Sequence, residues 1–106
     1  MPRYQIIYWR DIPVQVKVRD GDARSGLRLS HQLSPRFQKT VHRAAFRAKA
    51  ITGFDYIQEW RPSAWNEREE TPETIITIVT AELESAYSDE RLNTLALNKG
   101  FEPHDD

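Results

Sequence analysis

The stretch from Tyr4 to Arg19 constrains the fold more than any other part of the chain, because its pattern is that of a β-hairpin. Val14, Val16 and Val18 alternate with polar residues, and a period of two is typical of a half-buried strand. Residues 4–9 carry apolar side chains on both faces, which predicts a strand inside a sheet. We therefore expect the valines to face the core and the opposite face of the hairpin to lie open.

Length and composition favour one ordinary soluble domain. The chain has 106 residues, of which 39% are hydrophobic and 29% charged, enough for a single core without covalent staples. It contains no cysteine, so disulfides and thiolate chemistry are excluded. The first residues do not resemble a secretory signal, and no apolar run approaches the length of a membrane span. We expect a cytoplasmic protein that does not enter a membrane.

Two helices are predicted from their starts. Ser34-Pro35 and Thr71-Pro72 each place a capping residue before a proline, as helix N-termini prefer. Apolar residues at helical spacing follow from Phe37 to Ile51 and from Ile75 to Tyr87. A third, short helix is expected after Ser88. These boundaries predict a single domain over residues 1–87 and a C-terminal extension over 88–106, ending in a frayed acidic tail.

The two halves of the chain resemble each other. Residues 20–33 are predicted to form a long loop, and 56–67 a second, weaker hairpin. Trp9-Arg10 then recurs as Trp60-Arg61 near the end of the first strand of each hairpin. The resulting order, ββαββα, predicts the α+β class. We expect two ββα units that form a four-stranded antiparallel sheet with both helices on one face, a permuted ferredoxin-like sandwich.

Charge is distributed unevenly along the chain. Residues 1–53 hold eleven Lys/Arg and three Asp/Glu, whereas residues 54–106 hold four Lys/Arg and thirteen Asp/Glu. The halves either attract each other in the folded chain or form a bipolar surface that orients a partner. The basic residues of the first helix are a candidate docking face for an acidic partner, or simply a solvated face: Arg36, Lys39, Arg43 and Arg47.

Residue patterns for catalysis or for metal and cofactor binding are absent from the sequence. His31, His42 and His104 do not have metal-ligand spacing, and no phosphate-binding loop, dinucleotide motif or nucleophile elbow is present. We expect a non-enzymatic protein without metal or cofactor.

The most unusual feature is an aromatic and arginine set that forms a candidate interaction surface: Trp9, Arg10, Trp60, Arg61 and Trp65. Such residues dominate interface energies, so a protein partner or self-association is the leading interpretation. Partly buried framework tryptophans are the structural alternative. Single-stranded nucleic acid could also stack on an open aromatic sheet face, although the acidic second half would repel phosphates.

Three segments together resemble a known family: YQIIYWRDIPVQVKVRDG, LSPRFQKTVHRAAFRA and EWRPSAWNEREETPE. They are similar to the small bacterial "virulence factor" domain family, which includes stand-alone proteins and a terminal module of conserved virulence factor C-type proteins. The resemblance implies an interaction or accessory module, and it supplies no catalytic residues. Gene neighbours of stand-alone members imply, as an alternative, an accessory or ligand-binding role in folate- or corrinoid-dependent one-carbon metabolism.

Overall fold

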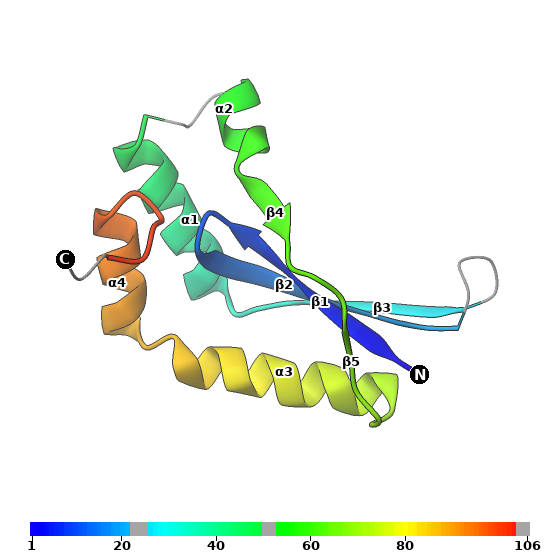
Figure 1. Cartoon of the computed structure of the whole chain (residues 1–106). Coiled ribbons are helices and arrows are strands. Elements are labelled where there is room, and N and C mark those ends of the chain that lie inside the picture. The colour runs from blue at the N-terminus through cyan, green and yellow to red at the C-terminus, as the bar shows by residue number, and fades with distance from the viewer. Residues whose placement is uncertain (22–25, 50–52, 104–106) are drawn as a thin grey trace.

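The computed structural model of the chain describes residues 1–21, 26–49 and 53–103. An antiparallel sheet is packed against helices (Figure 1), which confirms the α+β class. The elements in chain order are β1 (Arg3–Trp9), β2 (Ile12–Asp20), β3 (Leu27–Gln32), α1 (Pro35–Arg47), α2 (Gly53–Gln58), β4 (Trp60–Pro62), β5 (Asn66–Glu67), α3 (Pro72–Ala86) and α4 (Asp89–Leu97). Within the described ranges, none of the helices is long and apolar enough to cross a membrane.

The first hairpin is confirmed and forms the centre of the sheet. The strand order is β3-β2-β1-β4, and β5 pairs with β1 as well. Val16 lies opposite Ile6, and Val18 lies opposite Tyr4, so these side chains share one face. The valines are at most 5% exposed and form the floor of the core beneath α1 and α3.

The predicted long loop over residues 20–33 is wrong, because six of its fourteen residues form strand β3. Leu27–Gln32 pairs with β2 along its whole length. This strand lies at the edge of the sheet, and nearly all of its side chains are exposed. An edge strand of this kind needs few apolar residues, which is why the alternation was too weak to predict it. Residues 22–25 lie outside the described part of the chain.

The predicted second hairpin is also wrong. Much of the segment expected to begin it lies in the short helix α2. The strands that follow, β4 and β5, both pair with β1 and not with each other. Ser63, between them, continues the contact by donating its backbone N–H to the Ile6 carbonyl at 2.8 Å. The two repeated ββα units are therefore not formed, and the ferredoxin-like arrangement is not confirmed.

The helices begin where the sequence predicted. The Thr71 hydroxyl accepts the Thr74 backbone N–H at 3.3 Å, which caps α3. The first helix, α1, ends earlier than expected, at Arg47, since Lys49 adopts a left-handed φ of 60°. Residues 50–52, which the prediction placed in this helix, lie outside the described residues.

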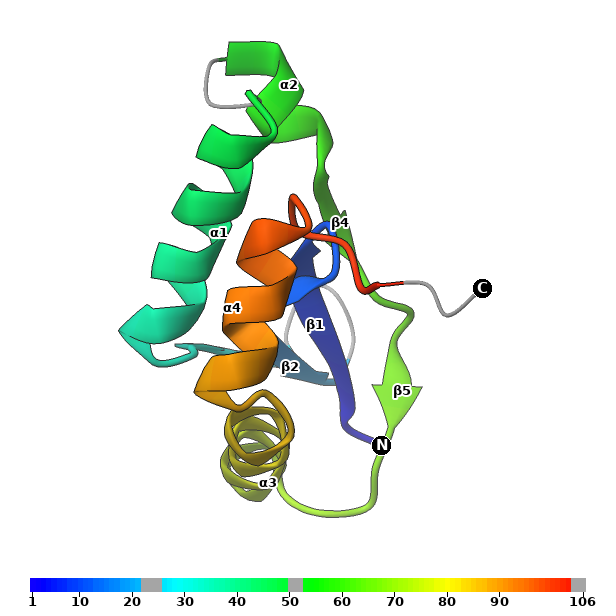
Figure 2. The ribbon, with the colours of Figure 1, turned by 90° about the vertical axis from the view of Figure 1, so that its left-hand side faces the viewer.

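The C-terminal extension packs against the rest of the molecule. Its helix α4 lies beside α1, with α3 below them (Figure 2). Leu92, Leu95 and Ala96 are buried, and the two leucines belong to the same core as the valines of β2. Glu102 accepts a hydrogen bond from Arg91 at 2.7 Å. The predicted tail beyond residue 103 is outside the described part of the chain.

Candidate functional site

The two Trp-Arg dipeptides of the sequence meet in the structure. Trp9 of β1 is the register partner of Trp60 of β4. Arg61 donates from Nε to the Arg10 carbonyl oxygen at 3.1 Å. The repeated dipeptide therefore reflects two neighbouring strand ends, where Arg and Trp side chains come together.

Trp9 belongs to the core and is not part of a surface. Its side chain is 0% exposed, and its indole Nε1–H donates to the Tyr56 carbonyl at 3.0 Å. Gly100 lies against the indole. The expectation that Trp9 points to an open sheet face is wrong, because a register shift between Ile7 and Tyr8 places Trp9 opposite Ile12, on the same face as the valines of β2.

Arg10 also has a structural role. Its guanidinium lies 5.0 Å from the ring centre of Trp9 and 4.7 Å from that of Phe101, within the range of cation–π contacts. It donates to the Lys99 carbonyl at 2.7 Å, and its side chain is only 13% exposed. Arg10 therefore joins the β1–β2 turn to the chain end after α4 and offers little surface to a partner.

The other three residues of the predicted interaction surface remain partly accessible, but they do not form one patch with Trp9. Trp60 is half-buried and packs edge-on against Tyr56. Arg61 is 63% exposed and binds the Asp11 carboxylate at 2.6 Å. Trp65 lies next to Arg19, whose guanidinium is 5.1 Å from the indole. Their use as an interaction surface stays a prediction.

Arg36, the first residue of the predicted basic docking face, ties α1 to α3. It donates to the Glu84 carboxylate at 3.1 Å, to the Glu84 carbonyl at 2.7 Å and to the Tyr87 carbonyl. The same carboxylate accepts the backbone N–H and the hydroxyl of Ser34, both at 2.8 Å. Arg36 is thus occupied within the chain, and its use in docking stays a prediction.

Glu84 is ionised in this network. Burial alone would raise the pKa of its carboxyl, but the hydrogen bonds from the Ser34 backbone, the Ser34 hydroxyl and Arg36 outweigh that effect. The pKa of Glu84 therefore lies below its ordinary value. The start of α1 at Ser34 is consequently stabilised by the carboxylate of Glu84 in α3, which accepts two hydrogen bonds from Ser34.

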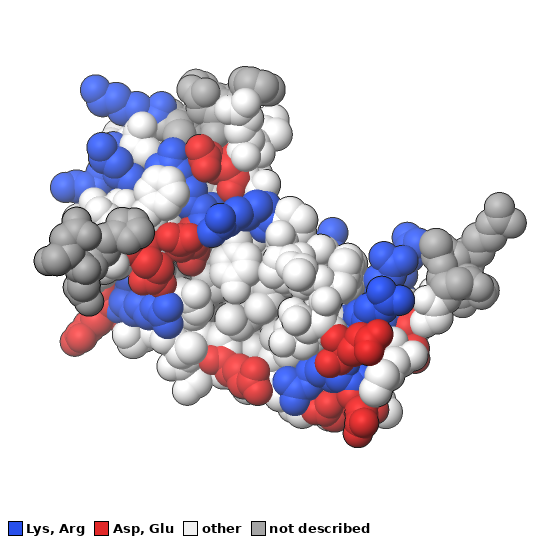
Figure 3. Space-filling model, viewed as in Figure 1, with Lys and Arg blue, Asp and Glu red and all other residues white. Residues whose placement is uncertain are grey.

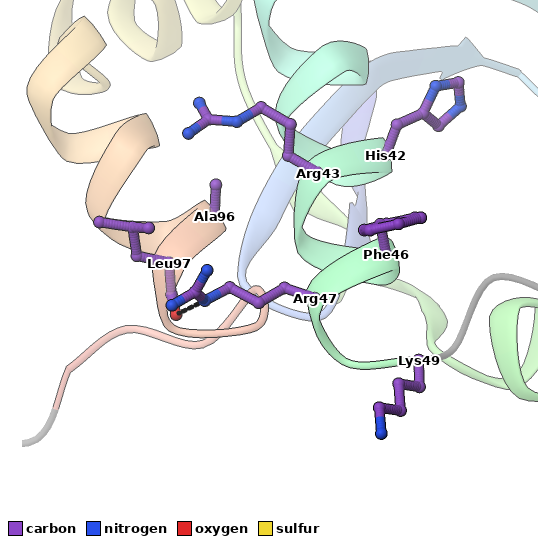
Figure 4. A pocket seen from close by; sticks show the side chains of 7 residues that line it. All are labelled: His42, Arg43, Phe46, Arg47, Lys49, Ala96 and Leu97. Carbon is purple, nitrogen blue, oxygen red and sulfur yellow. Dashed lines mark hydrogen bonds between the residues drawn. The ribbon is translucent and has the colours of Figure 1, made fainter.

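Arg43 and Arg47 extend from α1 across to α4 (Figure 4). Arg43 donates to the Asn93 side-chain oxygen at 2.8 Å, and Arg47 donates through Nε to the Leu97 carbonyl at 3.0 Å. Each bond uses one of the five N–H donors of a guanidinium, so both groups keep donors for further contacts. Lys39 is exposed on the same helix.

An open groove of about 580 Å³ lies at this end of the α1–α4 pair. It is lined by the apolar residues Phe46, Ala96 and Leu97, by the basic residues Arg43, Arg47 and Lys49, and by His42. Phe46 is 73% exposed and Leu97 51% exposed, although both are large apolar side chains. We call this feature the α1–α4 groove.

Positive charge gathers around the groove. In Figure 3, Lys and Arg side chains cluster at the upper left, over the end of α1. Among the residues that the structure describes, no acidic side chain lines the groove. A groove with an apolar centre and a cationic rim can hold a segment that combines apolar and acidic side chains.

Sequence reasoning found part of this groove and missed the rest. The basic face of α1 was identified, whereas Leu97 of α4 was not assigned a role. A signal was present in Phe46, a large aromatic residue outside the apolar stripe of a strongly basic helix. The contribution of Leu97 depends on how α4 packs on α1, which residue spacing does not indicate.

Comparison with known proteins adds the family. The sequence model of a family described as "Virulence factor" matches residues 7–96. The chain belongs to the virulence factor family. The matched range includes the end of β1, all of β2, α1 and α3, and most of α4, and therefore most of the α1–α4 groove. No curated protein and no solved structure matches the chain significantly.

Side chains that could bind a metal ion together are not found among the described residues. In residues 1–21, 26–49 and 53–103, no group of three or more potential ligands is close enough to hold a metal ion. The features that distinguish the surface are the apolar groove and its cationic rim.

Proposed function

We propose that this member of the virulence factor family is a non-enzymatic, cytoplasmic interaction module, which binds an acidic amphipathic segment of a partner protein in the α1–α4 groove. The observation that supports the proposal most directly is the exposure of Phe46 and Leu97 in a groove that three cationic side chains also line. Large apolar side chains that cluster on a surface commonly mark a site of association.

The chemistry of the rim selects the type of partner. Arg43, Arg47 and Lys49 would each attract a carboxylate, and close ionic contacts around an apolar centre fix the register of a bound peptide. An amphipathic helix with apolar residues at positions i, i+4 and i+7 presents one apolar ridge. Such a ridge would lie on Phe46 and Leu97, with acidic residues on either side reaching the cations.

The arginines of the rim are held in place before a partner arrives. The hydrogen bonds of Arg43 to Asn93 and of Arg47 to the Leu97 carbonyl restrict both side chains. Binding then loses less side-chain entropy than it would with two unrestrained arginines. This restriction favours a specific docking site over a merely solvated basic face.

The proposal is tested with two synthetic helical peptides of equal length and equal apolar pattern, one with Glu and one with Lys at the polar positions. NMR titration of the isotope-labelled protein locates the contact. We expect the Glu peptide to perturb signals of residues 42–49 and 96–97, with an affinity that falls as salt increases. The Lys peptide should leave these signals unchanged.

Matched variants make the test specific. Phe46→Ser and Lys49→Glu should each weaken binding of the Glu peptide about tenfold or more. Lys39→Glu, the same charge change on the same helix but outside the groove, is the control. Three results would contradict the proposal that the groove binds an acidic partner. The two peptides could bind equally well, or the perturbed signals could lie elsewhere on the molecule. The protein could also form a dimer that Phe46→Ser dissociates.

A further inference from the structure

A second hollow lies on the sheet, in a part of the molecule that the α1–α4 groove does not use. It has a volume of about 360 Å³, within the range of pockets that hold small molecules. The residues whose side chains matter to the argument are Gln5, Lys17, Arg19, Arg28, Ser30 and Trp65. We call this feature the sheet-face hollow.

The strand register shows why these residues gather. Gln5 lies opposite Lys17, and Lys17 lies opposite Ser30. In the next row Arg3 lies opposite Arg19, and Arg19 opposite Arg28. Because residues directly opposite one another share a face, both rows lie on the face away from the valines of β2.

This face concentrates positive charge. Arg19 and Arg28 lie directly opposite each other on neighbouring strands, with Lys17 in the next row. Glu67 is the register partner of Arg3 and lies at the outer end of the arginine row. No acidic side chain lines the hollow within the described ranges. The cationic side chains that line the hollow would attract an anionic ligand.

Trp65 adds an aromatic wall. It is half-buried, and the Arg19 guanidinium lies 5.1 Å from its ring centre. An indole in contact with a pocket can stack a planar ring, and stacking on a nucleobase does not depend on base identity. Gln5 is fixed nearby, since its amide donates to the Ser63 carbonyl at 2.9 Å.

We propose that the sheet-face hollow binds a mononucleotide, with the phosphate against Lys17, Arg19 and Arg28 and the base against Trp65. Guanidinium groups bind phosphate oxygens through paired hydrogen bonds, and the Ser30 hydroxyl can add a donor. The hollow offers one indole, which suits one base. A longer strand that continued past Trp65 along β5 would meet Glu67, Glu69 and Glu70, whose charges repel phosphodiesters.

The experiment is a titration of the isotope-labelled full chain with AMP, ATP, adenosine, inorganic phosphate and a short oligothymidine. We expect AMP and ATP to perturb the signals of Lys17, Arg19, Arg28 and the Trp65 indole, with ATP the tighter ligand. Adenosine alone and phosphate alone should bind more weakly than AMP, since each makes only half of the contacts.

Two variants test the assigned contacts. Lys17→Glu should weaken AMP binding about tenfold, the loss expected for one charge-assisted contact. Trp65→Leu should reduce the affinity for AMP while leaving the affinity for inorganic phosphate unchanged. Lys39→Glu is the matched control, because it changes the same charge on α1, away from the sheet face.

Three results would overturn the proposal. The first is that millimolar AMP perturbs no signal, and the second is that AMP and inorganic phosphate bind with equal affinity. The third is that oligothymidine binds more than about tenfold more tightly than ATP, which would indicate binding of a nucleic-acid strand. None of these results bears on the α1–α4 groove, because the two sites share no residue.

Discussion

A Cβ atom added to Gly100 would lie 2.9 Å from Cζ3 of Trp9, closer than a carbon–carbon contact allows. Gly100 also has a φ of 93°, and its carbonyl accepts the Asp11 backbone N–H at 2.8 Å. The chain end after α4 therefore closes over the core tryptophan only because this position has no side chain.

We expect Gly100→Ala to reduce the free energy of unfolding by about 2 kcal/mol, through backbone strain and the clash with the indole. Urea denaturation followed by circular dichroism measures the loss. In a Trp9→Phe background the clashing atom is absent, so the cost of Gly100→Ala should be smaller there. An unchanged cost in both backgrounds would show that the contact contributes nothing.

Replacing tryptophans should separate core from surface. Trp9→Phe removes buried volume and leaves the Tyr56 carbonyl without its indole donor, so we expect a loss of about 2 kcal/mol or more in the free energy of unfolding. Trp65→Phe, at a half-buried position, should cost less than about 1 kcal/mol. Equal losses would argue that Trp9 is not the better-packed residue.

Glu84→Gln should change how stability depends on pH. The folded chain holds the pKa of Glu84 below its ordinary value of 4.5, so the carboxylate stabilises the fold above that pH. This contribution is lost as pH falls through the lowered folded-state value. Since the side chain is 29% exposed, we expect a loss of only about 1 kcal/mol at neutral pH.

The acid limb of the stability curve is the diagnostic measurement for Glu84. Glu84→Gln should flatten this limb relative to the wild type. Glu82→Gln, the same change at a 63% exposed position of α3 that pairs with Arg68, is the matched comparison. If the wild type and Glu84→Gln lose stability identically as pH falls, the Glu84 carboxylate does not contribute to the free energy of unfolding.

Asp11→Ala should be more damaging than Arg61→Ala, although the two side chains form one ion pair. The Asp11 carboxylate also accepts the Glu102 backbone N–H at 2.8 Å, and it is 25% exposed against 63% for Arg61. We expect a loss of about 1–2 kcal/mol for Asp11→Ala and less than about 1 kcal/mol for Arg61→Ala. Thermal denaturation of both variants in one buffer compares them, and the reverse ranking would contradict this assignment.

The sequence predicted those parts of the fold in which local pattern and packing agree. The valines of β2 face the core as their alternation indicated, and the starts of α1 and α3 follow from Ser34-Pro35 and Thr71-Pro72. Each of these signals depends on residues close together in the chain, which is why they could be interpreted correctly without a structure.

The errors arose where tertiary contacts decide the outcome. Strand β3 is mostly polar because it lies at an edge, and the β-prone aromatic residues after Gly53 form the helix α2, so propensity gave the wrong element twice. Trp9 was placed on the wrong face because a register shift between Ile7 and Tyr8 interrupts the alternation of side chains along β1, and this shift is set by the pairing with β2. Of the candidate site, the arginines of α1 were predictable, but the exposure of Phe46 beside Leu97 depends on how α1 and α4 meet.

The interruption between β4 and β5 has a consequence for solubility. A continuous partner strand along β1 would itself present a long row of unpaired backbone groups, to which another copy could add and begin a polymer. Here the outer strand is broken into pieces of three and two residues, and Pro62 lacks a donor at the end of the first piece. This side of the sheet is therefore a poor template for the addition of further chains.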